Sequence, residues 1–223
     1  MSSELLIDND VIKKLAVYGL FEELQAISLP ADRQLMVLGA APFVLSKAIE
    51  KSKSIRVREA ALGRLQEALA LCEMIEPGDD EVSLAASLED TAQRLGLPFD
   101  QGESLLIAAL VFRASSALIT GDKRALGCTA TVIADHVILS ELSGRIACLE
   151  QVLFSLLGAG DGTSHAQRIC QEPDLDRAIS ICFGCASSFN LNAAKEGLQS
   201  YIESVRQSAE PLLADGVELS GLL

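Results

Sequence analysis

The chain has 223 residues, 49% of them hydrophobic, and its 31 acidic and 18 basic residues give a formal net charge of -13. That length can bury one sizeable core with an appendage, or two small domains, and no apolar run approaches the ~20 residues that span a bilayer. The negative charge argues against a simple nucleic-acid binder, and the start, Met1–Glu4, lacks a secretory signal, so we expect a cytoplasmic protein without a membrane partner.

The first part of the chain alternates short apolar runs with helical patterns, which predicts βαβ units and a mostly parallel sheet. Leu5–Ile7 is predicted as the first strand, residues 11–27 as one or two helices closed by Pro30, and Leu35–Leu38 as a buried second strand. From Pro42 to about Ile75 the pattern is helical throughout.

Turn formers at residues 76–79 separate this helical stretch from the rest of the chain. After the break we predict a helix that ends before Gly96 and Pro98, and then an apolar helix over residues 102–114. A break at Ser115 and Ser116 precedes a predicted strand at Ala117–Thr120. A helix over residues 126–142 and a last strand at Arg145–Leu149, with Glu150 at its end, complete this part.

The last third of the chain has only helical patterns. Gly158–Gly162 superficially suggests a phosphate loop, but it follows a predicted helix and lacks the lysine of a Walker loop. We therefore interpret it as a helix stop and linker. Residues 163–223 are predicted to be helical throughout, and residues 159–223 to form a helical C-terminal extension whose apolar faces cover the core or pair two subunits.

The six cysteines lie mostly in apolar stretches without framework spacing, so we expect free thiols in a reducing compartment. They are Cys72, Cys128, Cys148, Cys170, Cys182 and Cys185. Only Cys182 and Cys185 form a short motif. A zinc site there would need further ligands, which the chain offers only in two histidines and the other cysteines, so we expect none.

The basic residues are unevenly spread, and six of them lie in one stretch. They are Lys47, Lys51, Lys53, Arg56, Arg58 and Arg64. Such a stretch is typical of a solvated helix face. Next to a metal site, Lys47 and its neighbours would instead guide a phosphate backbone.

Acidic residues follow two predicted strands and open one predicted helix. Asp8, with Asp10 close behind it, follows the first strand, Asp122 follows the strand at Ala117–Thr120, and Glu103 begins the apolar helix. Carboxylates at the carboxyl ends of parallel strands face a common crevice, and Mg²⁺ and Mn²⁺ prefer carboxylate oxygens. Each acid also has a structural alternative, because aspartates cap helices and Glu103 is favoured at a helix N-terminus.

In this order and rough spacing, the residues resemble the PIN-domain nucleases. The resemblance covers about residues 1–158 and rests on the strand ending in Asp8, on Asp100–Glu103, on Ile119–Lys123 and on Gly144–Ile146. It implies an α/β fold, a three-layer α/β/α sandwich with a central mostly parallel sheet. Residues 1–158 would form the PIN-like domain, with a helical insertion around residues 51–97, before the C-terminal extension.

The resemblance also implies an activity, the hydrolysis of single-stranded or structured RNA with Mg²⁺ or Mn²⁺. Asp8, Glu103 and Asp122 would be the catalytic metal ligands. Thr120 would support the last acid or be simply a strand residue, and Lys123 would contact phosphate or merely begin the next helix in solvent. Many related nucleases are toxins neutralised by a partner antitoxin, so a protein partner of that kind is a further expectation.

The sequence departs from the family at one ligand position. The family usually carries an acid early in the helix after the second strand, where the closest match here is Lys47. Glu50 lies about one turn later and can substitute if the register differs. Asp10 and Asp100 are the other candidates to complete the set.

Two further functions stay open. Asp8-Asn9-Asp10 after an apolar strand also resembles haloacid-dehalogenase-type phosphatases, in which the first aspartate is a nucleophile and the second an acid/base. Glu103 has no place in that scheme. The other alternative is a catalytically decayed PIN-like module that binds protein. Separately, the apolar C-terminal extension leads us to expect a homodimer.

Overall fold

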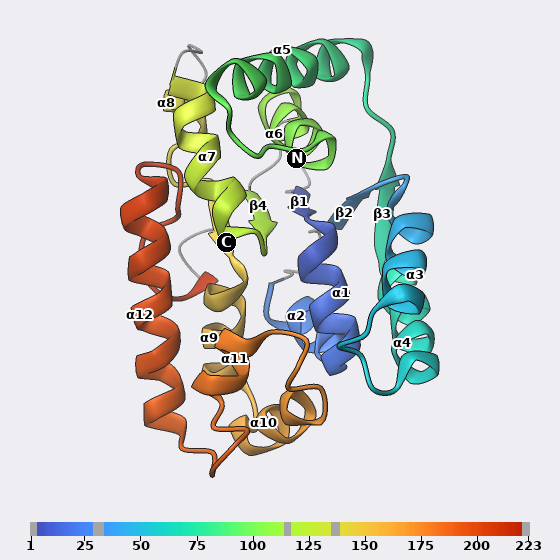
Figure 1. Cartoon of the computed structure of the whole chain (residues 1–223), viewed down its shortest axis with the longest axis vertical. Helices are drawn as coiled ribbons and strands as arrows, with labels where there is room; N and C mark the ends of the chain where they lie inside the picture. Colours follow the sequence, from blue (N-terminus) through green and yellow to red (C-terminus); the bar gives the residue numbers. More distant parts are fainter. Residues whose placement is uncertain (1–3, 29–33, 114–116, 135–138, 220–223) are drawn as a thin grey trace.

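The computed structural model describes residues 4–28, 34–113, 117–134 and 139–219, which form an α/β fold around a parallel sheet (Figure 1). Its strands are β1 (Glu4–Ile7), β2 (Gln34–Leu38), β3 (Cys72–Ile75), β4 (Ala117–Thr120) and β5 (Ile146–Cys148). Within the described residues the sheet has five strands in the order β3-β2-β1-β4-β5, and every neighbouring pair is parallel. The predicted α/β class and parallel sheet are confirmed.

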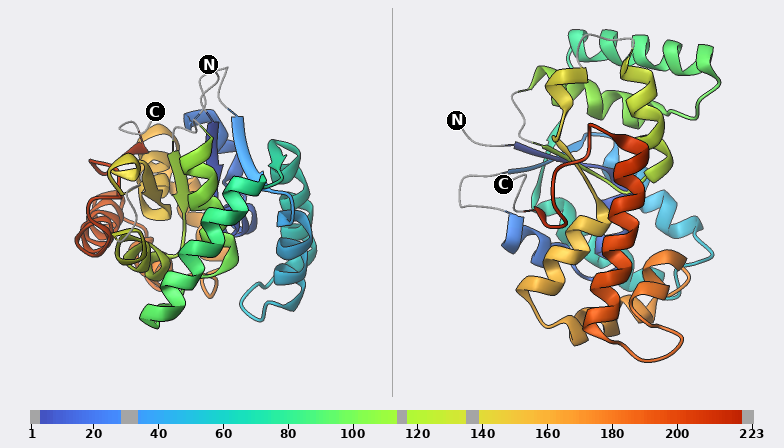
Figure 2. Two further views of the ribbon diagram at one scale, coloured as in Figure 1. Left: turned by 90° about the horizontal axis from the view of Figure 1, so that it is seen from above. Right: turned by 90° about the vertical axis from the view of Figure 1, so that its left-hand side faces the viewer.

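Helices lie on both sides of the sheet, consistent with a three-layer sandwich. They are α1 (Asn9–Tyr18), α2 (Phe21–Ser28), α3 (Ala41–Lys51), α4 (Arg58–Ala70), α5 (Asp79–Leu95), α6 (Gln101–Phe112), α7 (Lys123–Ala134), α8 (Leu139–Leu142), α9 (Leu149–Ala159), α10 (Gly162–Gln171), α11 (Arg177–Cys182) and α12 (Leu191–Ala209). In the right-hand view of Figure 2, α5 and α6 lie on one side of the strands and α1, α2 and α9 on the other.

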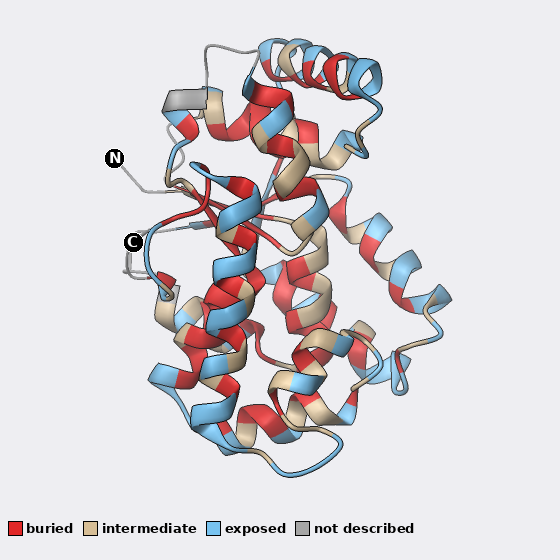
Figure 3. Ribbon diagram, turned by 60° about the vertical axis from the view of Figure 1, so that its left-hand side comes forward, coloured by how far each residue is buried: buried red, intermediate tan, exposed pale blue. Residues whose placement is uncertain are grey.

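The central strands are buried on both faces. Leu5, Leu6 and Ile7 of β1 are each at most 1% exposed, as expected of a parallel strand covered by helices on both sides. Figure 3 shows buried residues along the strands and on the inner sides of the surrounding helices. Leu198 and Ile202 of α12 belong to the same core, so the C-terminal part of the chain packs on the sheet domain and shares its interior.

Several segments differ from the predicted elements. The helix expected from Pro42 to about Ile75 is interrupted, because α3 ends at Lys51 and α4 begins only at Arg58. Non-helical segments also separate α10, α11 and α12, so residues 163–223 are not helical throughout as expected.

Residues 72–75 were expected to continue a helix but form β3, in register with β2, where Leu38 pairs with Ile75. The helical pattern of α4 runs up to Leu71 without a breaker, so the sequence gives no local signal for the change. Residues 210–219 were also expected to be helical, but they turn back, and Leu213 forms an isolated bridge with Ile146.

The last strand ends earlier than predicted. Leu149 and Glu150, predicted at the end of the last strand, begin α9 instead. The predicted breaks at Pro30 and at Ser115 and Ser116, and part of the helix predicted over residues 126–142, lie outside the described residues. No helix in the described ranges combines the length and the apolar character needed to cross a membrane.

The apolar face of α12 is covered by the chain itself. It consists of Ala194, Leu198, Ile202, Val205 and Ala209. These residues are buried, and α12 packs against α7 and α9. Because this face is not left open, it gives no reason to expect a homodimer, which stays a prediction.

A disulfide joins Cys170 and Cys185. The expectation of six free thiols is therefore wrong for this pair. Cys170 of α10 and Cys185, which follows α11, lie together although they are 15 residues apart in sequence. Cys182 stays a free thiol, so Cys182 and Cys185 do not act as a ligand pair. A reducing compartment stays a prediction without support from these two residues.

The segment enclosed by this disulfide fastens the C-terminal part of the chain to the N-terminal part. Glu172, 2% exposed, accepts hydrogen bonds from the backbone N–H groups of Arg56 and Val57 at 2.7 and 3.0 Å. Asp174 pairs with the Arg56 guanidinium at 2.8 Å. The third acid of the segment, Asp176, pairs with Lys14 of α1 at 2.8 Å.

Candidate functional site

The strand order places the candidate site at the junction of β1 and β4. The two strands are hydrogen-bonded neighbours, and the backbone N–H of Asp8 donates to the carbonyl of Ile119 at 2.9 Å. From β1 the chain proceeds to β2 on one side, whereas from β4 it proceeds to β5 on the other. Such a reversal opens a crevice at the carboxyl ends of the strands, where ligands bind in open α/β sheets.

A pocket of about 550 Å³ occupies this position and brings most of the predicted acids together. The acidic residues among those that line it are Asp8, Asp10, Asp100, Glu103 and Asp122. The structure therefore places acids from distant segments of the chain along one space.

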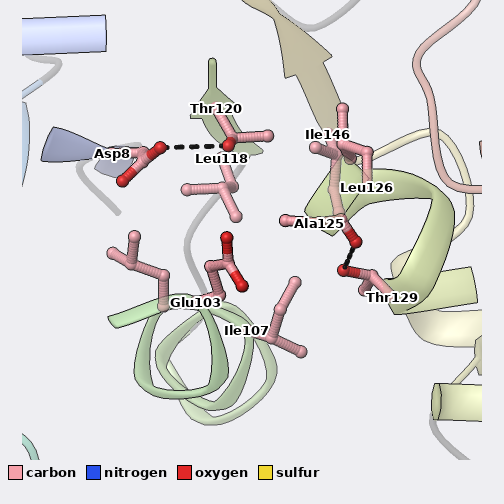
Figure 4. Close-up of a pocket in the computed structure, with 10 residues that line it drawn as sticks. Asp8, Glu103, Ile107, Leu118, Thr120, Ala125, Leu126, Thr129 and Ile146 are labelled. Carbon is pink, nitrogen blue, oxygen red and sulfur yellow. Dashed lines mark hydrogen bonds between the residues drawn. The ribbon is translucent and has the colours of Figure 1, made fainter. Parts of the chain in front are cut away.

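Asp8 and Glu103 also border a smaller cavity of about 20 Å³. Its other lining residues are mostly apolar, and it has room for about one water molecule. Figure 4 shows the two carboxyl groups pointing toward the same space. Their charges therefore meet in surroundings that solvate a carboxylate poorly.

Thr120 connects the two strand-end aspartates. It is 5% exposed, and its Oγ1 donates to Asp8 Oδ2 at 3.1 Å while accepting from the backbone N–H of Asp122 at 3.3 Å. Its hydroxyl therefore fixes the orientation of one acid and the backbone of the other.

The two aspartates differ in their use as helix caps. Asp122 Oδ1 accepts from the backbone N–H groups of Arg124 and Ala125 at 2.8 and 3.1 Å, so it caps α7. Asp8 occupies the N-cap position of α1 but makes no side-chain capping hydrogen bond. Helix capping, the structural alternative to a metal-binding role, therefore applies to Asp122 but not to Asp8.

Burial raises the pKa of Asp8, and the charge of Asp10 adds to this effect. The hydroxyl of Thr120 and the backbone N–H groups of Gly121 and Asn9 partly offset it. Keeping this carboxylate ionised therefore costs free energy in the folded chain.

Glu103 is held by a capping box at the start of α6. Its Oε2 accepts from the backbone N–H of Asp100 at 2.9 Å, and Asp100 Oδ1 accepts from the N–H of Glu103 at 3.0 Å. Burial nevertheless raises the pKa of Glu103 to about 7, with the charges of Asp100, Asp122 and Asp8 acting in the same direction. Four carboxylates thus repel one another across the pocket.

The Glu103→Gln variant is expected to change how stability depends on pH. In the unfolded chain Glu103 releases its proton near pH 4.5, whereas in the folded chain it does so only near pH 7. Its favourable contribution to the free energy of unfolding is therefore complete below pH 4.5 and is lost as the pH rises through 7. Gln keeps the capping box but has no proton to lose. We expect the variant to match the wild type at pH 4 and to exceed its free energy of unfolding by about 1 kcal/mol at pH 8, a value reduced for solvent screening.

Urea unfolding at a series of pH values measures this difference. Glu50→Gln, on an exposed residue of α3, is the matched control and should unfold like the wild type at every pH. Parallel pH profiles for Glu103→Gln and the wild type would show that Glu103 titrates normally.

Two lysines of α1 belong to the site and were missed at the sequence level. Lys13 lines the pocket and pairs with Asp10 Oδ1 at 2.7 Å, while Lys14 lies 2.7 Å from Asp10 Oδ2 and 2.8 Å from Asp176. Burial alone would raise the pKa of Asp10, but Lys14 and Lys13 outweigh it and lower the pKa. The helical spacing of three and four residues after Asp10 was the available signal.

Asp10 also explains why the residue after Thr120 is a glycine. A Cβ atom on Gly121 would lie 2.7 Å from Asp10 Oδ2, closer than real side-chain contacts come. The lack of a side chain at Gly121 lets α1 approach the end of β4.

Four of the predicted site residues do not line the larger pocket, and of these only Thr120 borders the smaller cavity among the described residues. Glu50 and Lys47 are exposed on α3, whose pocket-lining residues are Val44, Leu45 and Ala48. Lys123 Nζ lies 2.6 Å from Glu150 and 4.3 Å from the centre of the Tyr201 ring. Its predicted phosphate contact, and the predicted role of Glu50 as a ligand, have no support from this geometry.

The donor set suits a hard divalent cation in kind but is not arranged as a finished site. The pocket acids offer only oxygen ligands, as Mg²⁺ and Mn²⁺ prefer. However, no group of three or more histidine, cysteine, aspartate or glutamate side chains in the described ranges is placed to hold a metal ion. Asp10 is engaged by lysines, and Glu103 and Asp122 by backbone N–H groups.

Comparisons of the chain with protein-family models, with curated proteins and with solved structures give no match.

Proposed function

We propose that the chain is a metal-dependent endoribonuclease of the PIN type. The observation that carries the proposal is the convergence of Asp8, Glu103 and Asp122 on one pocket at the junction of β1 and β4. Burial raises the pKa of Asp8 and that of Glu103, the latter to about 7. A divalent cation is the ligand that would relieve their repulsion, and strongly perturbed acids in a cleft are typical of functional sites.

In this proposal Asp8, Glu103 and Asp122 hold the cation, which is Mg²⁺ or Mn²⁺. The cation would supply an activated water and neutralise charge on a phosphodiester. The residues of the chain orient the acids: Thr120 fixes Asp8, and the capping box keeps Glu103 at the pocket. Lys13 offers a positive charge at the pocket wall for a phosphate oxygen.

The phosphatase alternative ranks lower. It requires the second aspartate of Asp8-Asn9-Asp10 to act as a general acid near neutral pH. Lys13 and Lys14 hold Asp10 as a carboxylate and outweigh burial, so that its pKa is lowered. A carboxylate of that kind is a poor proton donor.

A decayed PIN-like module that binds protein is the second candidate. One specific observation favours it: within the described part of the chain, the pocket acids are tied to lysines or to backbone N–H groups and form no three-ligand set. A toxin role with an antitoxin partner belongs to the nuclease proposal, and the identity of such a partner stays a prediction.

Incubation of the purified protein with end-labelled RNA tests the proposal. Cleavage is expected with Mn²⁺ or Mg²⁺ and not with EDTA, because the proposed nucleophile is a water activated by the cation. p-Nitrophenyl phosphate serves as the phosphatase substrate and is expected to remain intact. An RNA that stays intact at every metal concentration would refute the nuclease proposal and favour the protein-binding module.

A further inference from the structure

The helix α3 carries an exposed aromatic and basic stripe beside the acidic pocket. Phe43, Lys47 and Lys51 follow one another at intervals of four residues, so they lie on nearly the same face of the helix. Phe43 is 72% exposed, more than any other large hydrophobic side chain in the described ranges. Lys47 Nζ lies 5.3 Å from the centre of its ring.

This stripe borders the residues of α3 that line the pocket. Val44 and Ala48 form part of the pocket wall and follow Phe43 and Lys47 directly in sequence. On a helix, the line 43-47-51 therefore runs alongside the line 44-48, between the pocket wall and solvent. Figure 1 shows α3 at the edge of the molecule, where its outer side is open.

The charge of the stripe contrasts with that of the chain. Lys47, Lys51 and Lys53 are exposed, and none of them makes an ion pair within the described residues, whereas the chain has a net charge of -13. Arg58 extends the basic surface beyond α3, and its Nε donates to the backbone carbonyl of Ser52. Unpaired cations beside a solvent-exposed ring match a ligand that carries both phosphates and stackable rings.

We propose that Phe43, Lys47 and Lys51 form a docking stripe for single-stranded nucleic acid. The ring of Phe43 stacks on one base, and the two lysines contact the phosphates that follow. A duplex keeps its bases stacked on one another, so it offers Phe43 no free face. The stripe leads the strand along the pocket wall, and this last point alone rests on the proposed nuclease function.

Fluorescence anisotropy with a labelled 12-nucleotide RNA, in EDTA and at low salt, tests the docking stripe. Phe43→Ala and Phe43→Leu are expected to weaken binding about tenfold, whereas Phe43→Tyr retains it, because stacking on one base is worth roughly that factor. Lys47→Gln combined with Lys51→Gln should lower the slope of log K against log salt by about 1.4, as expected for two lost phosphate contacts.

The chain offers matched controls for each change. Phe112 is an exposed phenylalanine on α6, and Lys195 on α12 contacts the Phe154 ring at 5.4 Å as Lys47 contacts Phe43. Phe112→Ala and Lys195→Gln are expected to bind RNA like the wild type. A labelled duplex of the same sequence should bind more weakly than the single strand, and equally to wild type and Phe43→Ala.

The possible outcomes separate this inference from the nuclease proposal. Wild-type affinity in Phe43→Ala and in the double lysine variant, or no binding of the single strand by the wild type, would overturn the docking stripe. Binding that depends on Phe43 without any cleavage in Mn²⁺ would support the stripe and refute the nuclease. Tighter binding of the duplex than of the single strand would contradict the stacking role.

Discussion

Replacing Asp8 by asparagine is expected to lower the rate of RNA cleavage by at least about 100-fold, the loss typical of removing one group that stabilises charge in a transition state. Asparagine has nearly the same shape and can still accept the hydrogen bond from Thr120 Oγ1. It cannot supply the negative charge that we assign to Asp8 as a cation ligand. Initial rates with labelled RNA and saturating Mn²⁺ measure the effect.

The same variant should fold at least as well as the wild type. Burial raises the pKa of Asp8, so the ionised carboxylate is disfavoured in the folded chain and a neutral side chain relieves that cost. Asp174→Asn, at a residue whose side chain is 65% exposed and lies outside the pocket, is the matched control and should keep wild-type cleavage. Equal cleavage by Asp8→Asn and wild type would remove Asp8 from the site.

Lys123→Met is expected to have the largest effect on stability, a loss of about 3 kcal/mol in the free energy of unfolding. Lys123 Nζ lies 2.6 Å from the carboxylate of Glu150, which is 2% exposed. Removing the lysine leaves this buried carboxylate without its cation, and breaking such a pair costs ~3–5 kcal/mol. We expect the low end of this range of free energies because the side chain of Lys123 is 32% exposed and so partly solvated.

Urea unfolding at pH 7.5 measures this loss, and a second variant separates charge from packing. Lys123→Met combined with Glu150→Leu removes both charges, and it is expected to recover the free energy of unfolding to within about 1 kcal/mol of the wild type. A single variant as stable as the wild type would mean that Glu150 is solvated or paired elsewhere. A double variant as unstable as the single one would assign the loss to packing against Tyr201.

The site was predictable from the sequence where it depends on strand ends. Asp8 and Asp122 each follow a buried apolar run, and parallel strands put their carboxyl ends at one edge, so their proximity follows from the pattern. Glu103 was placed with them by its family resemblance. The structure brings it to the pocket because α6 begins at that edge.

The parts that the sequence did not predict depend on rotation about a helix axis or on distant contacts. Glu50 was a reasonable ligand by spacing, but only the packing of α3 decides that Val44 and Ala48 line the pocket. The strand at residues 72–75 forms through pairing with β2, which the local pattern does not encode. The contact of Lys14 with Asp176 joins distant parts of the chain, so no short-range pattern reports it.

The ion pairs of Lys14 bear on how this protein can be divided. Asp10 at the pocket and Asp176 before α11 share that lysine, and Glu172 holds the backbone of the segment between α3 and α4. A fragment ending at residue 158 would therefore lack the counter-charge that Asp176 gives Lys14 and the acceptor that Glu172 gives Arg56. An activity assay on that fragment alone would therefore report on a pocket with altered charge.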